Sequence, residues 1–304
     1  MEKKILFRIL SVLCCLTIAT NLCYAQGDQP SGYGTEDNPY LITNYDELLW
    51  FAKYVNDGNN SANAKLTNNI VVNTLEFDSN GEIVTKGKNY SEWIPIGTET
   101  QMFKGTFDGA GYIISGLYFN DDEVSNAGLF GKSTKNGSIK NVGVVDSYIK
   151  GKNHVGGIVG HNGNCTVSNV FSTSTVEGSE CVGGIVGYTE AGTIVNAYNM
   201  GAIKGISWVG GIAGVINSVT VKNVYSSGTV SSSQSNKIVR GLFEINENGN
   251  RVYNAFSNTD FFDGSVIKDN KGRTYYNDED KKVIGKTTAE LAALTIGFVG
   301  ADFP

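Results

Sequence analysis

Val182-Gly-Gly-Ile-Val-Gly187 decides the fold, because it is the middle one of three copies of a hexapeptide at constant spacing. The other two copies are Val155-Gly-Gly-Ile-Val-Gly160 and Val209-Gly-Gly-Ile-Ala-Gly214. The three begin at positions 155, 182 and 209, so the offset is 27 at both steps. Self-similarity at a fixed period indicates a repeat architecture, in which neighbouring units stack and bury a shared core. We therefore expect the centre of the chain to be an array of stacked units.

A second segment repeats in step with the hexapeptide. Its three clear copies, at the same offset, are Val167-Ser-Asn-Val-Phe171, Ile194-Val-Asn-Ala-Tyr198 and Val221-Lys-Asn-Val-Tyr225. Weaker copies of both segments flank them, at residues 127–131 with 139–142 and at residues 241–243 with 252–256. The sequence thus predicts five repeats.

The length of the repeat favours a β-helix. Short apolar segments separated by Gly, Asn and Ser show no helical periodicity, and a repeat of this length is too short for a strand-helix-strand unit. Each repeat would form one coil, stacked on the next at about 4.8 Å, so that aligned aliphatic residues form internal columns. The three predicted columns are Leu129, Ile158, Ile185, Ile212 and Leu242; Ile139, Val167, Ile194, Val221 and Val252; and Ile149, Val176, Ile203 and Val230.

Polar and aromatic residues recur in the same register. An Asn occurs once per coil, at positions 141, 169, 196, 223 and 254. Because stacked amides bond to the coils above and below, we interpret this column as a structural ladder rather than a row of ligand contacts. The aromatic residues two positions later are interpreted as a stacked internal or corner column and not as a sugar-binding platform. They are Phe171, Tyr198, Tyr225 and Phe256.

The regions outside the repeat coils of residues 118–256 are predicted to close the array. Residues 37–117 are expected to form an N-terminal cap and the first coils, with Asn44 and Glu47 as the capping box of a helix over residues 45–55. We expect a looping insertion at residues 83–99. Residues 257–304 are expected to form a C-terminal cap region, with a hairpin around residues 269–272 and a short helix at residues 287–294.

The N-terminus has the pattern of a secretory signal peptide over residues 1–25. Lys3, Lys4 and Arg8 precede about 14 apolar-rich residues, fewer than the roughly 20 needed to span a bilayer. No second stretch approaches spanning length, so the mature chain from Gln26 is predicted to lack a transmembrane segment. Residues 26–36 are expected to be disordered.

Charge and cysteine content limit the partners and the covalent structure. Residues 1–25 hold three of the 24 basic and one of the 30 acidic residues, so the mature net charge is −8 and nucleic acid is not expected as a partner. Cys165 and Cys181 occupy different columns, so their α-carbons should lie too far apart for a disulfide. We expect two buried or half-buried thiols.

Residues suited to catalysis or metal binding are scarce. His154 and His161 are predicted to lie on opposite sides of one strand, without Cys, Asp or Glu at metal-ligand spacing. Two groups of carboxylates, residues 121–123 and Asp260 with Asp263, are interpreted as solvated turns, although the first also offers hard oxygens for calcium. The sequence predicts no catalytic, cofactor-binding or metal-binding residue.

The chain resembles GLUG-motif repeat proteins, a class of bacterial extracellular proteins. Residues 126–131 and the three hexapeptides carry the motif, and segments such as Trp93-Ile-Pro-Ile-Gly97 and Phe103-Lys-Gly-Thr-Phe-Asp-Gly109 resemble the lead-in that precedes such repeats. The resemblance covers most of residues 33–295 and implies an all-β, right-handed parallel β-helix, the usual hand of parallel crossovers. Such repeats occur in adhesin-like surface proteins and beside the catalytic domains of immunoglobulin-cleaving metallopeptidases, but this chain has no His-Glu-x-x-His helix.

These observations predict a non-catalytic, secreted or cell-surface scaffold that serves adhesion or ligand and glycan binding. Its partner would be an extracellular protein or a glycan. A carbohydrate-active β-helix enzyme, either a polysaccharide lyase or a hydrolase, is the alternative. An accessory segment related to the immunoglobulin-cleaving metallopeptidases is another.

Overall fold

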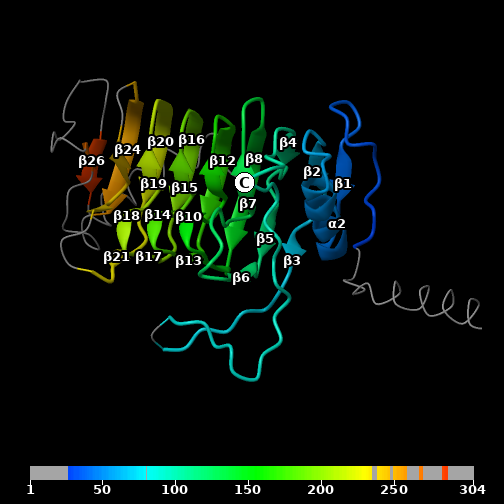
Figure 1. Ribbon diagram of the computed structural model, residues 1–304, viewed down its shortest axis with the longest axis horizontal. Helices are drawn as coiled ribbons and strands as arrows, with labels where there is room; N and C mark the ends of the chain where they lie inside the picture. The colour runs from blue at the N-terminus through cyan, green and yellow to red at the C-terminus, as the bar shows by residue number, and fades with distance from the viewer. Residues whose placement is uncertain are drawn as a thin grey trace, which may run out of the picture.

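The chain folds as a parallel β-helix, as the repeat predicts. The computed structural model describes residues 27–79, 81–234, 238–246, 249–258, 267–269 and 283–286. Figure 1 shows the coils stacked along the long axis, from the helix α2 (Tyr45–Asn56) at one end to β26 (Val283–Lys286) at the other.

The array has four sheets of parallel strands, of which sheet I runs from the first coil to the last described one. Sheet I has 11 strands: β1 (Tyr40–Ile42), β2 (Ala64–Leu66), β3 (Ile70–Val71), β4 (Thr106–Asp108), β5 (Ile113–Ser115), β8 (Ser138–Val145), β12 (Thr166–Ser172), β16 (Gly192–Asn199), β20 (Val219–Ser226), β24 (Arg251–Asn258) and β26. Sheet II has β6 (Tyr118–Asn120), β9 (Tyr148–Lys150), β13 (Thr175–Glu177), β17 (Ile203–Gly205) and β21 (Val230–Ser232). Sheet III has β10 (Asn153–Gly156), β14 (Glu180–Gly183), β18 (Ser207–Gly210) and β22 (Val239–Arg240). Sheet IV has β7 (Phe130–Ser133), β11 (Val159–Asn162), β15 (Val186–Thr189), β19 (Ala213–Ile216), β23 (Phe243–Ile245) and β25 (Ile267–Asp269).

The strand register reproduces the period of the sequence repeat. Val182 of β14 pairs with Val155 of β10 on one side and with Val209 of β18 on the other. In sheet I, Ile194 pairs with Val167 and Val221 in the same way. Equivalent residues of successive coils are therefore direct neighbours, and each predicted column is a physical column.

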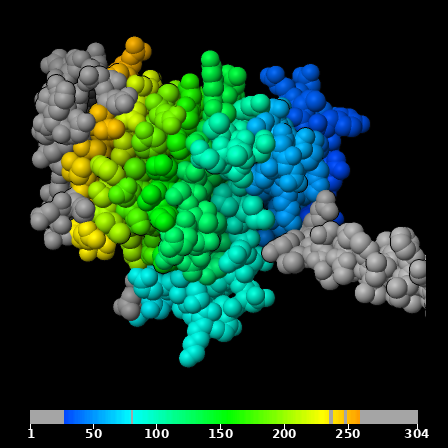
Figure 2. Space-filling model, viewed as in Figure 1, coloured from blue at the N-terminus to red at the C-terminus, as the bar shows by residue number. Residues whose placement is uncertain are grey.

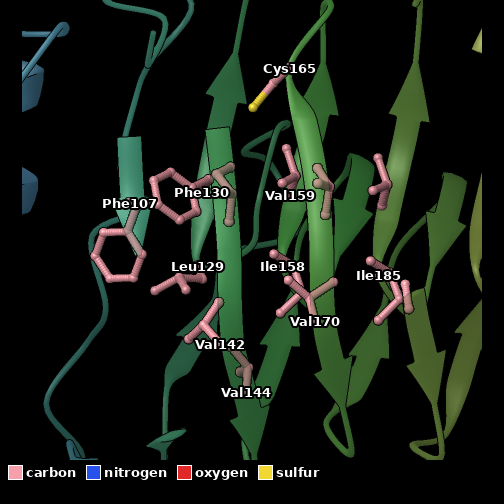
Figure 3. Packing of buried hydrophobic residues seen from close by; sticks show 14 of the residues in the cluster. Phe107, Leu129, Phe130, Val142, Val144, Ile158, Val159, Cys165, Val170 and Ile185 are labelled. Atoms are coloured by element: carbon pink, nitrogen blue, oxygen red, sulfur yellow. The ribbon is translucent and has the colours of Figure 1, made fainter. Parts of the chain in front are cut away.

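The columns form two separate cores. The first two predicted columns are buried in a large core enclosed mainly by sheets I and IV, shown in Figure 3, where Ile158 and Ile185 lie in line along the array. The third column, represented by Val176, is buried in a smaller core with Val155 and Val182 of sheet III. The sequence predicts all three columns but not their division into two cores.

The glycines of the hexapeptide occupy positions that have no room for a side chain. A Cβ added to Gly183 would lie 2.1 Å from the carbonyl oxygen of Val186, and one added to Gly184 would lie 2.3 Å from Cγ of Asn199. Both distances are shorter than the 3.0 Å below which Cβ atoms in proteins essentially never approach another atom. The Gly-Gly pair is thus explained by close packing inside the coil.

The N-terminal end is capped as predicted. The amide N–H of Glu47 donates to Oδ1 of Asn44, and the carboxylate of Glu47 accepts from the amide of Thr43 at 2.6 Å. The helix buries one face on the first coil through residues that include Phe51 and Val55. Trp50 is partly exposed and stacks on Tyr54, with ring centroids 4.6 Å apart.

The prediction of disorder is wrong for residues 27–36, which are ordered against the cap. The amide of Leu41 donates to the carbonyl of Ser31 at 2.7 Å, in an antiparallel bridge. The carbonyl of Gly34 accepts from the amide of Asn63 at 2.8 Å. This segment covers the outer edge of β1, whose backbone groups would otherwise lack partners.

The predicted insertion at residues 83–99 is displaced in the structure. Trp93 and Ile96 are fully buried, and their amides donate to the carbonyls of Tyr118 and Leu129, so residues 93–99 belong to the coil. The segment that projects from the array consists of residues 74–79 and 81–90, which we call the arm (Figures 1 and 2). Near its tip, Glu82 forms an ion pair with Lys204 of β17.

The C-terminal boundary predicted at residue 256 is also displaced. β25 pairs in parallel with β23, and β26 pairs in parallel with β24, so the stack continues to residue 286. The predicted hairpin at residues 269–272, the helix at residues 287–294 and the signal peptide at residues 1–25 fall partly or wholly outside the described residues.

Cys165 and Cys181 are buried free thiols, as predicted. They belong to different sheets, because Cys165 directly precedes β12 of sheet I whereas Cys181 lies in β14 of sheet III.

Replacing Ile185 by Asp should destroy the cooperative unfolding of the array. Ile185 is completely buried in the large core, and a carboxylate there costs several kcal/mol in addition to about 1.5–3 kcal/mol of lost burial. This is comparable with the whole stability of a typical domain. Thermal unfolding followed by circular dichroism measures the effect, with Thr166→Asp on an exposed position as the control. An unchanged melt in Ile185→Asp would show that the column is not internal.

Candidate functional site

The Asn residues predicted to form a ladder do so. In each coil the side-chain amide Nδ2 donates to Oδ1 of the Asn in the preceding coil, at 2.8 to 3.0 Å, through residues 141, 169, 196, 223 and 254. The first amide, of Asn141, donates to the carboxylate of Asp108 at 2.9 Å. Asp108 was not predicted, because it belongs to the lead-in and lies outside the clear repeats.

The ladder explains the residue type at this position. All five Asn residues have a left-handed backbone, with φ between 49° and 55°. This backbone conformation is unfavourable for most residues other than Gly, but Asn adopts it at a lower energetic cost. The column therefore combines a backbone requirement with inter-coil bonding and serves the fold.

Two substitutions at Asn196 should separate these effects. Asn196→Gly removes two ladder hydrogen bonds and should lower the free energy of unfolding by about 1–3 kcal/mol. Asn196→Ala removes the same bonds and adds left-handed strain, so it should be less stable than Asn196→Gly by about 1 kcal/mol. Urea unfolding of both variants tests this, and an alanine variant as stable as the glycine variant would contradict the strain argument.

The aromatic residues predicted to form a stacked internal or corner column do stack, but Phe171, Tyr198 and Tyr225 are half-buried on the outer face of sheet I, whereas Phe256 is buried. Val170 and Ser172 are buried, whereas Phe171 between them is partly exposed. The ring of Phe171 lies 4.9 Å from that of Tyr198, with 5° between their planes, and Tyr198 stacks equally on Tyr225. Because the ring faces cover one another, they are not available as a platform for sugars.

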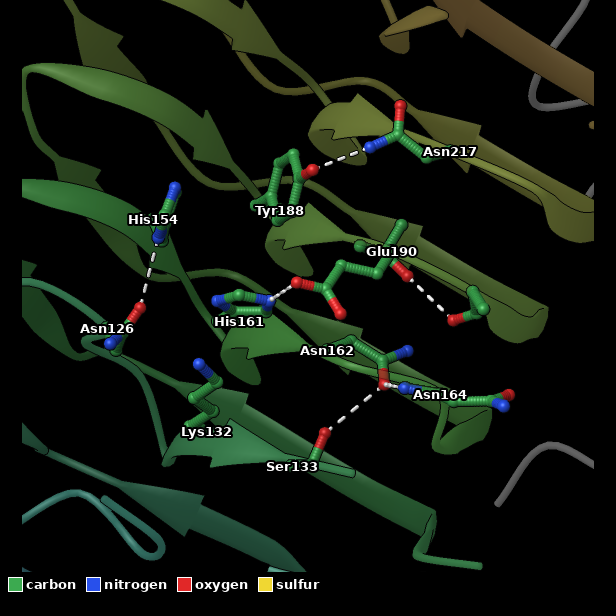
Figure 4. Close-up of polar contacts among 12 residues, drawn as sticks. Asn126, Lys132, Ser133, His154, His161, Asn162, Asn164, Tyr188, Glu190 and Asn217 are labelled. Atoms are coloured by element: carbon green, nitrogen blue, oxygen red, sulfur yellow. Dashed lines mark hydrogen bonds and ion pairs between the residues drawn. The ribbon is translucent and has the colours of Figure 1, made fainter. Parts of the chain in front are cut away.

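His154 and His161 are brought together, which corrects their predicted separation on opposite sides of one strand. They lie on two strands, β10 and β11, and the chain turns between them at Gly157. Their ring centroids are 5.1 Å apart, and both rings lie about 5 Å from the ring of Tyr188 on β15. We call these three residues, with Glu99, Asn126, Lys132 and Glu190, the histidine corner; Figure 4 labels all of them except Glu99.

Hydrogen bonds fix the protonated nitrogen of each imidazole. Nδ2 of Asn126 donates to Glu99 at 3.2 Å, so Oδ1 of Asn126 must accept from Nδ1 of His154, 3.1 Å away. Nε2 of His161 donates to Oε1 of Glu190 at 3.1 Å. Each imidazole thus keeps one nitrogen with a lone pair, Nε2 of His154 and Nδ1 of His161.

Burial and charge keep both imidazoles neutral. The pKa of His154 is lowered to about 4, first by burial and then by the proximity of His161 and Lys132. The pKa of His161 is also lowered by burial and by Lys132, although Glu190 opposes this shift. Lys132 in turn forms an ion pair with Glu99 at 2.6 Å, which lowers the pKa of Glu99.

The corner does not form a metal centre in this arrangement. The ring nitrogen of His154 that is not bonded to Asn126 points away from His161 in Figure 4. Throughout the part of the chain that the structure describes, no group of three or more His, Cys, Asp or Glu residues could hold a metal ion.

The acidic loop at residues 121–123 is tied to the neighbouring coil. The carboxylate of Asp122 lies 3.5 Å from Nζ of Lys150, and that of Glu123 lies 3.0 Å from Nζ of Lys152. Asp260 and Asp263 lie outside the described residues.

The histidine corner should make folding stability depend on pH. Unfolded imidazoles take up protons below about pH 6.5, whereas His154 in the folded chain does so near pH 4, so stability should fall as the pH decreases from 6.5 towards 4. Urea unfolding at several pH values measures this fall, which should be smaller in His154→Asn. Trp208→Asn, at the same left-handed position in another coil, should keep the wild-type slope. Equal slopes in wild type and His154→Asn would contradict the assignment.

A comparison with known protein families identifies one repeat unit as a known motif. The model of the family described as the GLUG motif matches residues 151–177, which form one coil from Gly151 to the end of β13. The chain carries a GLUG motif. The coils that follow at the same spacing repeat this GLUG unit.

Two relatives match just under half of the chain. Halomucin of Haloquadratum walsbyi is 31% identical over 149 residues, which are 48% of this chain and 2% of that protein. A "Putative Gly-rich membrane protein" of Evansella cellulosilytica is 31% identical over 134 residues, which are 43% of this chain and 14% of that protein. This chain therefore spans a small part of either relative.

A solved structure shares the fold. The crystal structure of a "putative immunoglobulin A1 protease" from Bacteroides ovatus superposes with a TM-score of 0.59 over 90% of this chain and 91% of that chain. The sequences are 17% identical, so the likeness concerns the fold alone.

Proposed function

We propose that this GLUG β-helix is a non-catalytic scaffold, secreted or held at the cell surface, that binds an extracellular protein or a glycan. The main support for the proposal is that the repeated residues serve packing and bonding between coils. The aliphatic columns, the glycines and the Asn ladder hold coil to coil and do not converge on a reaction centre. The outward faces and the arm are the parts left for contact with a partner.

An extracellular location rests on sequence and relatives. The signal-peptide pattern at residues 1–25 supports export. One relative has a name that describes a membrane protein, which supports a place at the cell envelope. Among the described residues, no helix has the length and apolar character needed to cross a membrane.

The two alternative functions can each be compared with a specific observation. The B. ovatus structure supports an accessory segment related to immunoglobulin-cleaving peptidases, because its name describes a protease and its chain shares this fold. A carbohydrate-active enzyme would need two carboxylates placed on either side of a glycosidic bond, or a base for lyase chemistry. Glu99 and Glu190 are the acidic pair at the histidine corner, and both are already engaged with neighbouring side chains.

Binding without cleavage is the expected result for the full chain, expressed with its own N-terminus in a bacterial host. We expect it in the medium or on the cell surface. It should bind at least one component of an array of extracellular matrix proteins and glycans. Incubation with plant, host and bacterial polysaccharides should release neither reducing ends nor unsaturated products. Product release would support the enzyme alternative, and absence of binding to every component would contradict the scaffold proposal.

A further inference from the structure

We infer that the histidine corner is a binding site for a neutral, hydroxyl-rich glycan segment, and that it releases this ligand in acid. The inference rests on the proposed binding function and assigns it to named residues. His154, Glu190 and Glu99 would contact the glycan. His161, Lys132 and Tyr188 would position these three residues.

The exposed carboxylates of Glu99 and Glu190 and the half-buried imidazole of His154 offer hydrogen-bond acceptors. Nε2 of His154 carries a lone pair, because its Nδ1 holds the proton that Asn126 accepts. Glu190 uses Oε1 for His161, and its side chain is 55% exposed. The Glu99 side chain is 68% exposed while it holds Lys132. A surface that offers acceptors selects a ligand that offers donors, as sugar hydroxyl groups do.

The supporting residues hold these acceptors in place. The side chain of His161 is only 8% exposed and orients Glu190 through its Nε2–H. The ring of Tyr188 stacks on His154 at 5.0 Å, and its hydroxyl accepts from Nδ2 of Asn217 at 2.6 Å. Such preorganised polar groups lose little freedom when a ligand binds.

The charge of the corner favours a neutral ligand over a cationic peptide. Lys132 neutralises Glu99, and both imidazoles are uncharged, so Glu190 supplies the single net negative charge. A site for Lys-rich or Arg-rich peptides would be expected to hold several unneutralised carboxylates.

Acid should convert the acceptors into donors. Protonation of His154 removes its lone pair and places a positive charge against His161 on β11 and Lys132 on β7. Glu99 and Glu190 favour the protonated imidazoles, but burial and the nearby Lys132 outweigh them and keep the pKa of both histidines lowered. Cys181 on the adjacent strand stays neutral, because burial raises the pKa of its thiol to about 12. Binding is therefore expected to persist through mildly acidic pH and to be lost as the pH approaches 4.

The test measures binding of the full chain to neutral oligosaccharides of glucose, mannose, galactose and N-acetylglucosamine, with a hexalysine peptide as the cationic probe. His154→Asn preserves the left-handed backbone, since Asn126 occupies the same register, and Tyr188→Val copies Val215 of the next coil. Each variant, and Glu190→Gln, should weaken the affinity for a bound oligosaccharide by at least about tenfold, the effect of losing one good hydrogen bond. Met200→Ala, on another exposed surface, is the control and should bind like wild type.

The possible results distinguish failure of the proposed glycan site from failure of the proposed scaffold function. Oligosaccharide binding that is insensitive to salt, weakened by the three variants and lost near pH 4 supports the inference. Binding that survives His154→Asn places the glycan elsewhere, and binding to matrix proteins without any oligosaccharide leaves the scaffold proposal standing; either result overturns the site. Salt-sensitive binding of hexalysine alone would make the corner a peptide site and would also overturn the inference. Circular dichroism melts of each variant confirm that it is folded.

Discussion

The structure depends on in-register hydrogen bonding between the backbones of successive coils. The amide of Ile158 donates to the carbonyl of Ile185, and the amide of Ile185 donates to that of Ile212, at 2.9 to 3.0 Å. A single coil leaves these groups without partners and its aliphatic residues exposed, so stability arises between coils. The register that satisfies the backbone also aligns valine with valine and asparagine with asparagine. The constant period of the sequence is thus a consequence of this constraint.

Two positions with a left-handed backbone recur from coil to coil, and they are used differently. The first holds the Asn ladder, where side-chain bonding and backbone preference agree. The second holds Asn126, His154, Cys181 and Trp208, so its residue type changes from coil to coil. Strained positions of this kind often occur at functional sites. The histidine corner is built on the second position, where the repeat leaves the side chain free to vary.

The structure could be predicted from the sequence where the residues repeat at a fixed period. Some predictions were wrong in the segments outside the repeat. The columns through Ile185, Ile194 and Ile203 and the Asn ladder could be predicted because equivalent residues must stack. The capping helix could be predicted from local chemistry at Asn44 and Glu47. The arm and the ordered segment at residues 27–36 belong to the irregular lead-in, where no period fixes the pairing. The sequence predicts one strand for His154 and His161, because the turn at Gly157 between β10 and β11 has no pattern of its own within the hexapeptide. Their contact with Tyr188 joins two coils. It arises because His161 and Tyr188 are paired residues of stacked strands.

Deletion of one complete coil tests the central claim most directly. Removing residues 178–204, which span one full period from Gly178 to the residue before Gly205, should leave a shorter β-helix. Its cooperative melt and parallel β-sheet spectrum should be retained, because Glu177 then leads into a coil of the same register. Removing only residues 178–201, a segment shorter than the period, should abolish cooperative unfolding, because the columns on the two sides of the junction are then out of register. Cooperative melting of both deletions, or of neither, would contradict the account.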